Sequence, residues 1–208
     1  MPDPRFAKLV VFVNSLVPAA LLGWDAWRGQ LGANPYEFAT RCSGVLALLF
    51  LLLSLAVTPA RKVLGQPWLA RFRRTLGLFG FSYATLHLLT YVWFDKGFHL
   101  QAIVRDVGRR PFITIGMGSF LLLGLLAATS PSRVIKRMGG RRWARLHKLA
   151  YVTACGGVLH YYLLVKADTR PPLAFAAALG LLLGYRVLNR YLPRGTERKP
   201  PRPVRAAS

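Results

Sequence analysis

Four histidines are the residues of this sequence whose chemistry depends most on where the fold places them. His87 and His160 each lie inside a long apolar run, where an ionisable side chain is costly and marks a functional site by default. His87 follows Thr75, the first residue of its run, by twelve residues, and His160 follows His147 by thirteen. We therefore expect the two imidazoles at similar depths in two helices. Two neutral imidazoles facing each other suit a low-spin haem iron with no open position for substrate, and such a site carries electrons.

The residues that share a helical face with these two histidines are mostly small. Small side chains three, four and seven residues earlier are expected to let a planar macrocycle approach the backbone. In a second interpretation they only allow close helix packing, and each histidine hydrogen-bonds a neighbouring helix. A metal without a porphyrin is less favoured, because the runs offer almost no carboxylate or thiolate at that depth. The positions are Gly80, Tyr83 and Ala84 for His87, and Thr153, Gly156 and Gly157 for His160.

A second cofactor position is conceivable nearer the other end of these runs. His147 lies about 20 Å before His160 along a helix, but about 220° around it, so the two share a face only if Gly156 and Gly157 bend the helix. A histidine at the membrane rim is the alternative. Arg73 lies fourteen residues before His87 and keeps its face; it stays protonated, so it suits a haem propionate better than an iron. His99 lies among polar residues, as in a solvated loop.

The composition indicates which elements must hold these residues. Of 208 residues, 53% are hydrophobic and only 17% charged, yet the net charge is +22, so apolar and basic segments must be segregated. Runs of about 20 apolar residues predict membrane-spanning helices, because strand edges would leave amides unpaired in lipid. We expect an all-α membrane protein with a six-helix transmembrane bundle, and Thr58-Pro59 and Ser130-Pro131 should end the second and fourth runs. The six runs are 7–27, 42–58, 75–94, 112–130, 147–165 and 173–192.

The basic residues predict the orientation of this bundle. Of 29 Lys and Arg, 21 fall on one side, which predicts that both termini are cytoplasmic. These residues are expected to contact anionic lipid, and no nucleic acid, since the apolar runs leave no soluble basic face. We interpret residues 1–192 as one transmembrane domain and 193–208 as a basic, disordered cytoplasmic tail.

The two cysteines, Cys42 and Cys155, are expected at different depths, so a disulfide is not predicted. Neither lies in a C-x-x-C-H motif, so any haem would be of the non-covalent b type.

Several stretches resemble one bacterial family in order and spacing. They are LAVTP (55 to 59), RRTLGLFGFSYATLHLLTYVWFD (73 to 95), RRPFITIGMGSFLLLGLLAATS (109 to 130) and RWARLHKLAYVTACGGVLHYYLLVK (142 to 166). They are similar to the haem-binding membrane subunits of the periplasmic methionine-sulfoxide reductase system, the MsrQ or YedZ family, within the ferric-reductase-like superfamily. The resemblance covers roughly residues 5 to 192.

This resemblance implies two histidines on each of two helices holding two stacked b haems. His147 and His160 match one pair and His87 matches the outer member of the other, while Arg73 stands where the inner member is expected. An inner haem is therefore absent, or is held by His147 with another ligand. The resemblance also implies an inner-membrane electron conduit to a periplasmic molybdenum-cofactor reductase that repairs oxidised methionines. Electrons would come from quinone or a flavin reductase, and FMN would accompany the haem; basic loops 59–74 and 131–148 could hold its phosphate.

Two other functions fit the same residues. A ferric or other metal-chelate reductase would use the same haem site for an external metal. A membrane transporter would instead use the intramembrane histidines to relay protons.

Overall fold

The computed structural model describes residues 3–191, and within them every element of regular secondary structure is helical. This confirms the predicted all-α class for the described part. The predicted tail at 193–208 lies outside the described residues. The long helices are α1 (Pro4–Trp27), α2 (Pro35–Val63), α3 (Phe72–Thr90), α5 (Pro111–Ala128), α8 (Leu149–Leu164) and α9 (Arg170–Tyr191). The short elements are η1 (Pro67–Arg71), the π-helical η2 (Tyr91–Asp95), α4 (Leu100–Arg109), α6 (Ser132–Met138) and α7 (Gly140–Leu146).

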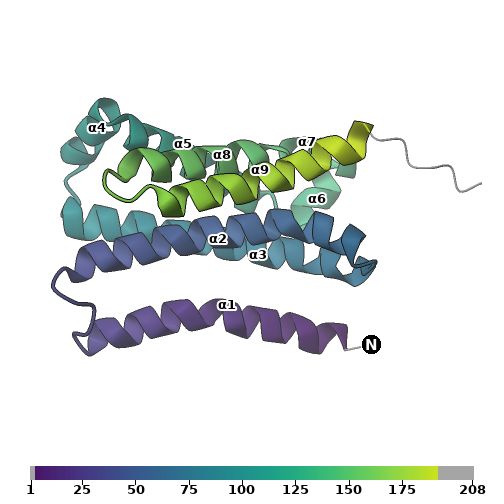
Figure 1. Cartoon of the computed structure of the whole chain (residues 1–208), viewed down its shortest axis with the longest axis horizontal. Helices are drawn as coiled ribbons and strands as arrows, with labels where there is room; N and C mark the ends of the chain where they lie inside the picture. Colours follow the sequence, from purple (N-terminus) through teal and green to yellow (C-terminus); the bar gives the residue numbers. More distant parts are fainter. Residues whose placement is uncertain (1–2, 192–208) are drawn as a thin grey trace, which may run out of the picture.

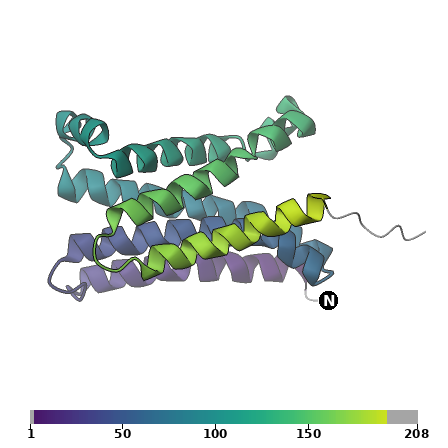
Figure 2. The same cartoon turned by 45° about the horizontal axis from the view of Figure 1, so that its top comes forward.

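The long helices run roughly side by side along the molecule (Figure 1). α1 lies along one side, α2 and α3 form the middle, and α5, α8 and α9 lie beyond them. The short helices occupy the two ends, with α4 at one end and α6 and α7 at the other (Figures 1 and 2). The basic segments around α6 and α7 therefore lie at the same end as the start of α1 and the last turns of α9.

Four of the helices are long and apolar enough to cross a membrane: α1 from Arg5, α2, α5 and α9. α8 has only 16 residues, and α3 carries Arg73 and Arg74 near its start. Both nevertheless pack inside the bundle, α3 against α2 and α8 against α5. The structure thus supports a multi-pass protein, while six crossings and the side on which the termini lie stay predictions.

Pro59 does not end the second helix, so that expectation is wrong. α2 continues to Val63, four residues beyond the proline. Proline has no N–H to give to the carbonyl of Leu55 one turn earlier. Arg186 from α9 supplies the missing donor, because its Nη2 lies 2.6 Å from that carbonyl oxygen. The helix can therefore pass through the proline.

The largest apolar core forms where α2, α5, α8 and α9 meet. Leu55 and Ala154 are almost fully buried there, and Leu179 is the buried residue that α9 contributes. This core fixes α8 against α2, which sets the position of the residues further along both helices. The remaining buried members are Leu48, Leu51, Leu52, Leu123 and Val158.

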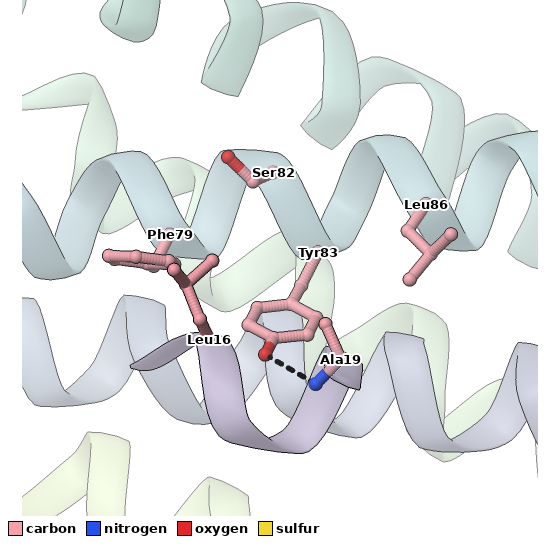
Figure 3. A pocket seen from close by; sticks show the side chains of 6 residues that line it. All are labelled: Leu16, Ala19, Phe79, Ser82, Tyr83 and Leu86. Atoms are coloured by element: carbon pink, nitrogen blue, oxygen red, sulfur yellow. Dashed lines mark hydrogen bonds between the residues drawn. The ribbon is translucent and has the colours of Figure 1, made fainter. Parts of the chain in front are cut away.

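α1 is attached mainly through one tyrosine. The hydroxyl of Tyr83 on α3 donates to the carbonyl of Ser15 (2.7 Å) and accepts from the backbone N–H of Ala19 (3.2 Å). Ser15 and Ala19 are the two ends of one helical hydrogen bond, so the hydroxyl inserts into the ladder of α1 beside Pro18. Figure 3 shows Tyr83 reaching α1 in a small crevice, which is also lined by Leu16, Phe79, Ser82 and Leu86.

An ion-pair cluster ties α4 to the end of α3. Lys96 Nζ lies 2.6 Å from Asp106 and 3.1 Å from Asp95, and the hydroxyl of Tyr91 donates to Asp106. The hydrogen bond and charge of Lys96 hold the pKa of Asp106 below its usual range, and Asp106 raises the pKa of Lys96. All four ion pairs of the described residues lie at this end of the bundle.

Candidate functional site

The imidazoles of His87 and His160 lie next to each other inside the bundle. Their ring centroids are 6.1 Å apart and their planes are nearly perpendicular, at 82°. His87 comes from the last turn of α3 and His160 from the last turns of α8. The packing of α3 on α2 and of α8 on α5 brings the two rings together from helices that are far apart in sequence.

Each of these imidazoles is oriented by a backbone carbonyl on a neighbouring helix. Nδ1 of His87 lies 2.8 Å from the carbonyl oxygen of Thr40 on α2, and Nδ1 of His160 lies 2.6 Å from that of Phe112 on α5. A carbonyl can only accept, so Nδ1 must carry the proton in both rings. The lone pair of each imidazole is therefore on Nε2, and no hydrogen bond within residues 3–191 uses either Nε2. This is the usual arrangement of a histidine that ligates a metal.

Two glycines leave the space that these rings fill. A Cβ at Gly44 of α2 would stand 2.9 Å from Nδ1 of His87, and one at Gly116 of α5 would stand 2.6 Å from Nδ1 of His160. Each glycine follows the accepting carbonyl by four residues, that is, by one helical turn: Thr40 to Gly44, and Phe112 to Gly116. Sequence reasoning missed both glycines. The signal that could have found them is their position: Gly44 lies near the start of run 42–58 and Gly116 near the start of run 112–130, and each of these runs precedes one that contains a histidine.

The small residues on the histidines' own helices play a different part from the one expected. A Cβ at Gly80 would stand 3.2 Å from the backbone nitrogen of Leu51, so this glycine lets α3 pack closely on α2. Gly156 lies against the side chain of Ser119 in the same way. Tyr83 faces α1. The prediction that these small residues make room for a flat group is wrong for Gly80 and Gly156, because helix packing already fills that space.

His147 lies apart from this pair, where α7 ends and α8 begins. The helix is interrupted by a turn at His147 and Lys148, whereas α8 is continuous through Gly156 and Gly157. The bend considered at the two glycines therefore does not form. The ring of His147 packs on Trp143 with centroids 4.1 Å apart, and its Nε2 lies 3.1 Å from the hydroxyl of Thr129. His147 is therefore partly enclosed at the basic end of the bundle.

Arg73 lies in the first turn of α3 at the same end, near enough for its charge to act on His147. The hydroxyl of Ser54 on α2 donates to the backbone carbonyl of Arg73, which anchors this first turn. At the opposite end, His99 is exposed and its Nδ1 contacts the carbonyl of Lys96 in the loop before α4.

The donor set limits which group the histidine pair could hold. Within the described residues no three His, Cys, Asp or Glu side chains come together as a metal site. Cys42 and Cys155 are both free thiols, and Cys155 is exposed on the outside of α8. A metal at His87 and His160 would need its other ligands from a non-protein group. A planar macrocycle supplies four such ligands and leaves two axial positions for the imidazoles.

Comparison with known proteins identifies the family. Residues 43–158 match the family described as ferric reductase like transmembrane component. The chain belongs to this family. The match includes His87 and His147 and ends two residues before His160.

This ferric reductase-like protein is similar over most of its length to three curated relatives, each called "Protein-methionine-sulfoxide reductase heme-binding subunit MsrQ". The relative from Polaromonas naphthalenivorans is 48% identical over 187 residues, covering 89% of this chain and 85% of the relative. That from Rhodospirillum rubrum is 47% identical over 196 residues, covering 94% of both chains. That from Caulobacter vibrioides is 47% identical over 178 residues, covering 86% of this chain and 85% of the relative.

Proposed function

We propose that this ferric reductase-like protein is the haem b subunit of a bacterial methionine-sulfoxide reductase system. In this function His87 and His160 are the axial ligands of a haem, and the chain passes electrons across the inner membrane. The observation that carries the proposal is the histidine pair with both Nδ1 atoms donating to carbonyls and both Nε2 atoms unused within residues 3–191. The names of the relatives support the same cofactor.

The separation of the rings fits an iron between them. Metal–imidazole bonds are about 2 Å long, so an iron bonded to both Nε2 atoms separates the ring centroids by roughly 6 Å. The observed separation is 6.1 Å. When bound, the haem supplies a one-electron redox centre in the membrane. The chain's own residues would orient the two imidazoles and, by holding each Nδ1–H to a carbonyl, would keep each Nε2 a strong donor to the iron.

The charge distribution supports one orientation of the bundle in the membrane. The end with α6 and α7 is basic and would be cytoplasmic, and the end with α4 would face the periplasm. Electrons would enter from quinone or a flavin reductase and leave to a periplasmic reductase carrying a molybdenum cofactor. An inner haem held by His147 with Arg73 at a propionate, or an FMN on the basic loops, would cover the remaining depth. The grouping of Arg73 and His147 at one end supports an inner cofactor.

The experiment that tests the haem site is an absorption spectrum of the purified, detergent-solubilised chain. Sharp reduced b-type bands that disappear in His87→Ala and His160→Ala, and persist in His99→Ala, support the proposal. A wild-type chain without such bands would refute it and favour a proton-relaying transporter.

The electron acceptor is tested separately. Reduced chain should be fully reoxidised when a small, substoichiometric amount of the periplasmic reductase and an excess of methionine sulfoxide are both added, and methionine sulfoxide alone should have no effect. Reoxidation by a ferric chelate in place of the reductase would assign the chain to metal reduction.

A further inference from the structure

Arg186 is a charged residue in the last turns of α9 that joins three helices. Its Nη2 donates to the carbonyl of Leu55 on α2, and its Nη1 donates to the hydroxyl of Tyr151 on α8. Its guanidinium also lies over the Tyr151 ring, 4.9 Å from the centroid. These contacts explain why the side chain turns inward, since it repairs the helical ladder interrupted by Pro59.

The same contacts leave the charge of Arg186 uncompensated. Its Nε is buried and has no hydrogen-bond partner, and it is the only such side-chain atom among the described residues. A carbonyl and a hydroxyl carry no charge, and the partly buried guanidinium of Arg186 would be stabilised further by an anion. Five of the six acidic residues in residues 3–191 belong to the opposite end of the bundle, and the sixth, Asp3, caps the start of α1.

A second arginine lies close to Arg186. The charge of Arg73 acts on Arg186 as well as on His147. Adjacent residues of α2 hold the two arginines: Ser54 donates to the backbone carbonyl of Arg73, and Leu55 accepts from Arg186. One turn of α2 thus contacts the backbone of Arg73 and the guanidinium of Arg186, and no ion pair within residues 3–191 includes either arginine.

We propose that Arg186, Arg73 and Tyr151 form a binding site for an oxyanion, a carboxylate or phosphate group carried by a ligand at the basic end of the bundle. The guanidinium of Arg186 has donors left over, Nε–H among them, that can form paired bonds to two oxygens. Tyr151 can donate its hydroxyl proton while it accepts from Arg186. The site deepens the proposed function by adding an anchor for a cofactor, but it does not depend on the haem between His87 and His160.

Three sources could bring the oxyanion: a haem propionate, a flavin phosphate or an anionic lipid headgroup. Each is tested on the full-length purified chain with Arg186→Gln, which keeps a hydrogen-bonding group but removes the charge. The matched control is Arg190→Gln, one turn later on α9, where the side chain is exposed. The bands of the His87–His160 haem report in every variant whether the bundle is folded.

The propionate is tested by the ratio of haem to chain. We expect Arg186→Gln to lose a discrete fraction of the haem while the bands of the His87–His160 haem remain. The phosphate is tested by comparing the binding of FMN with that of riboflavin, which lacks the phosphate, by quenching of flavin fluorescence. The lipid is tested by comparing phosphatidylglycerol with phosphatidylcholine in nanodiscs by native mass spectrometry.

If the oxyanion is a phosphate, the wild type should bind FMN over riboflavin, or phosphatidylglycerol over phosphatidylcholine, by about tenfold or more. If it is a propionate, the wild type should hold more haem per chain than Arg186→Gln. Arg186→Gln should remove that preference, and Arg190→Gln should keep it. The site is overturned if the wild type shows neither preference and Arg186→Gln loses no haem. It is also overturned if a preference survives in Arg186→Gln. If Arg186→Gln does not fold, Tyr151→Phe decides, because an unchanged preference in that variant equally overturns the site.

Discussion

Gly116 stands so close to His160 that any side chain at the glycine would meet the imidazole ring. The position of a Cβ there is 2.6 Å from Nδ1 and 2.9 Å from Cε1. The ring thus lies against the backbone of α5 at Gly116 and donates to the carbonyl of Phe112, one turn earlier on the same helix. The orientation of this imidazole therefore depends on the absence of a methyl group at Gly116, one helical turn after Phe112.

Gly116→Ala should therefore displace the ring of His160. We expect a loss of about 1–3 kcal/mol in stability, typical of overpacking, together with a shifted midpoint potential or a lower haem content. Gly118→Ala is the matched control on the same helix, since a Cβ there meets nothing within 4 Å. A redox titration and a thermal unfolding curve of both variants measure the difference. Equal behaviour of the two alanine variants would show that Gly116 does not position the ligand.

His87→Ala and His160→Ala should each abolish the low-spin haem spectrum, because one lost axial ligand leaves five-coordinate or empty iron. His99→Ala should leave the spectrum unchanged, since His99 is exposed in the loop before α4. Optical spectra of the three variants at equal protein concentration provide the test. A full low-spin spectrum in either of the first two would contradict the bis-histidine site.

A reporter fused after Ser208 should behave as a cytoplasmic protein, because 21 of the 29 basic residues fall on the side assigned to the cytoplasm. The measurement is the activity of an alkaline phosphatase fusion, which should be inactive there and active when fused within the loop that follows α8. The reverse pattern of activity would invert the topology.

The contact between α4 and the end of α3 should depend on pH only outside the neutral range. Asp106 has a lowered pKa, so its contribution is present above about pH 4 and is lost as pH falls through the folded-state pKa. Lys96 has a raised pKa, so its contribution is complete below about pH 10 and is lost only above its folded-state pKa. A nitroxide at Gln101→Cys, with both native cysteines replaced by serine, should be equally restrained from pH 5 to 9 and released only as the pH falls through the lowered pKa of Asp106. Asp106→Asn should release it at pH 7, and restraint in that variant would assign the contact to apolar packing.

If an inner haem exists, His147→Ala should lower the haem content by a discrete fraction and slow reduction from the cytoplasmic side. Arg73→Lys should mainly shift a midpoint potential, because lysine keeps the charge but not the two-pronged geometry. Haem content and reduction rate of both variants provide the test. An unchanged spectrum and rate in His147→Ala would leave it a rim residue that packs on Trp143 and contacts Thr129.

The sequence was sufficient to predict the helical class and the two histidines that meet. Apolar runs and basic loops follow directly from the cost of placing charge in lipid, and similar spacings from the starts of two runs, twelve and thirteen residues, placed His87 and His160 at similar depths. Contacts between helices could not be derived in this way. Whether Gly80 makes room for a cofactor or for a neighbouring helix depends on which helix faces it, and the structure places Leu51 there.

Pro59 shows the same limit from the other direction. Local rules end a helix at proline because a carbonyl loses its donor. The donor to the carbonyl of Leu55 comes from Arg186, 131 residues after Leu55 in the chain, and no local pattern contains that information. Gly44 and Gly116 were missed for a related reason, since a glycine in an apolar run looks the same whether it faces lipid or an imidazole.

The hydroxyl of Tyr83 between Ser15 and Ala19 has a consequence for how the protein assembles. Ser15 is the only buried residue of α1 among those described, so this helix adds little to the core. The hydroxyl of Tyr83 can bridge these two residues only when α3 is already in place. We therefore expect α1 to join the bundle after α3, although α1 precedes α3 in the chain.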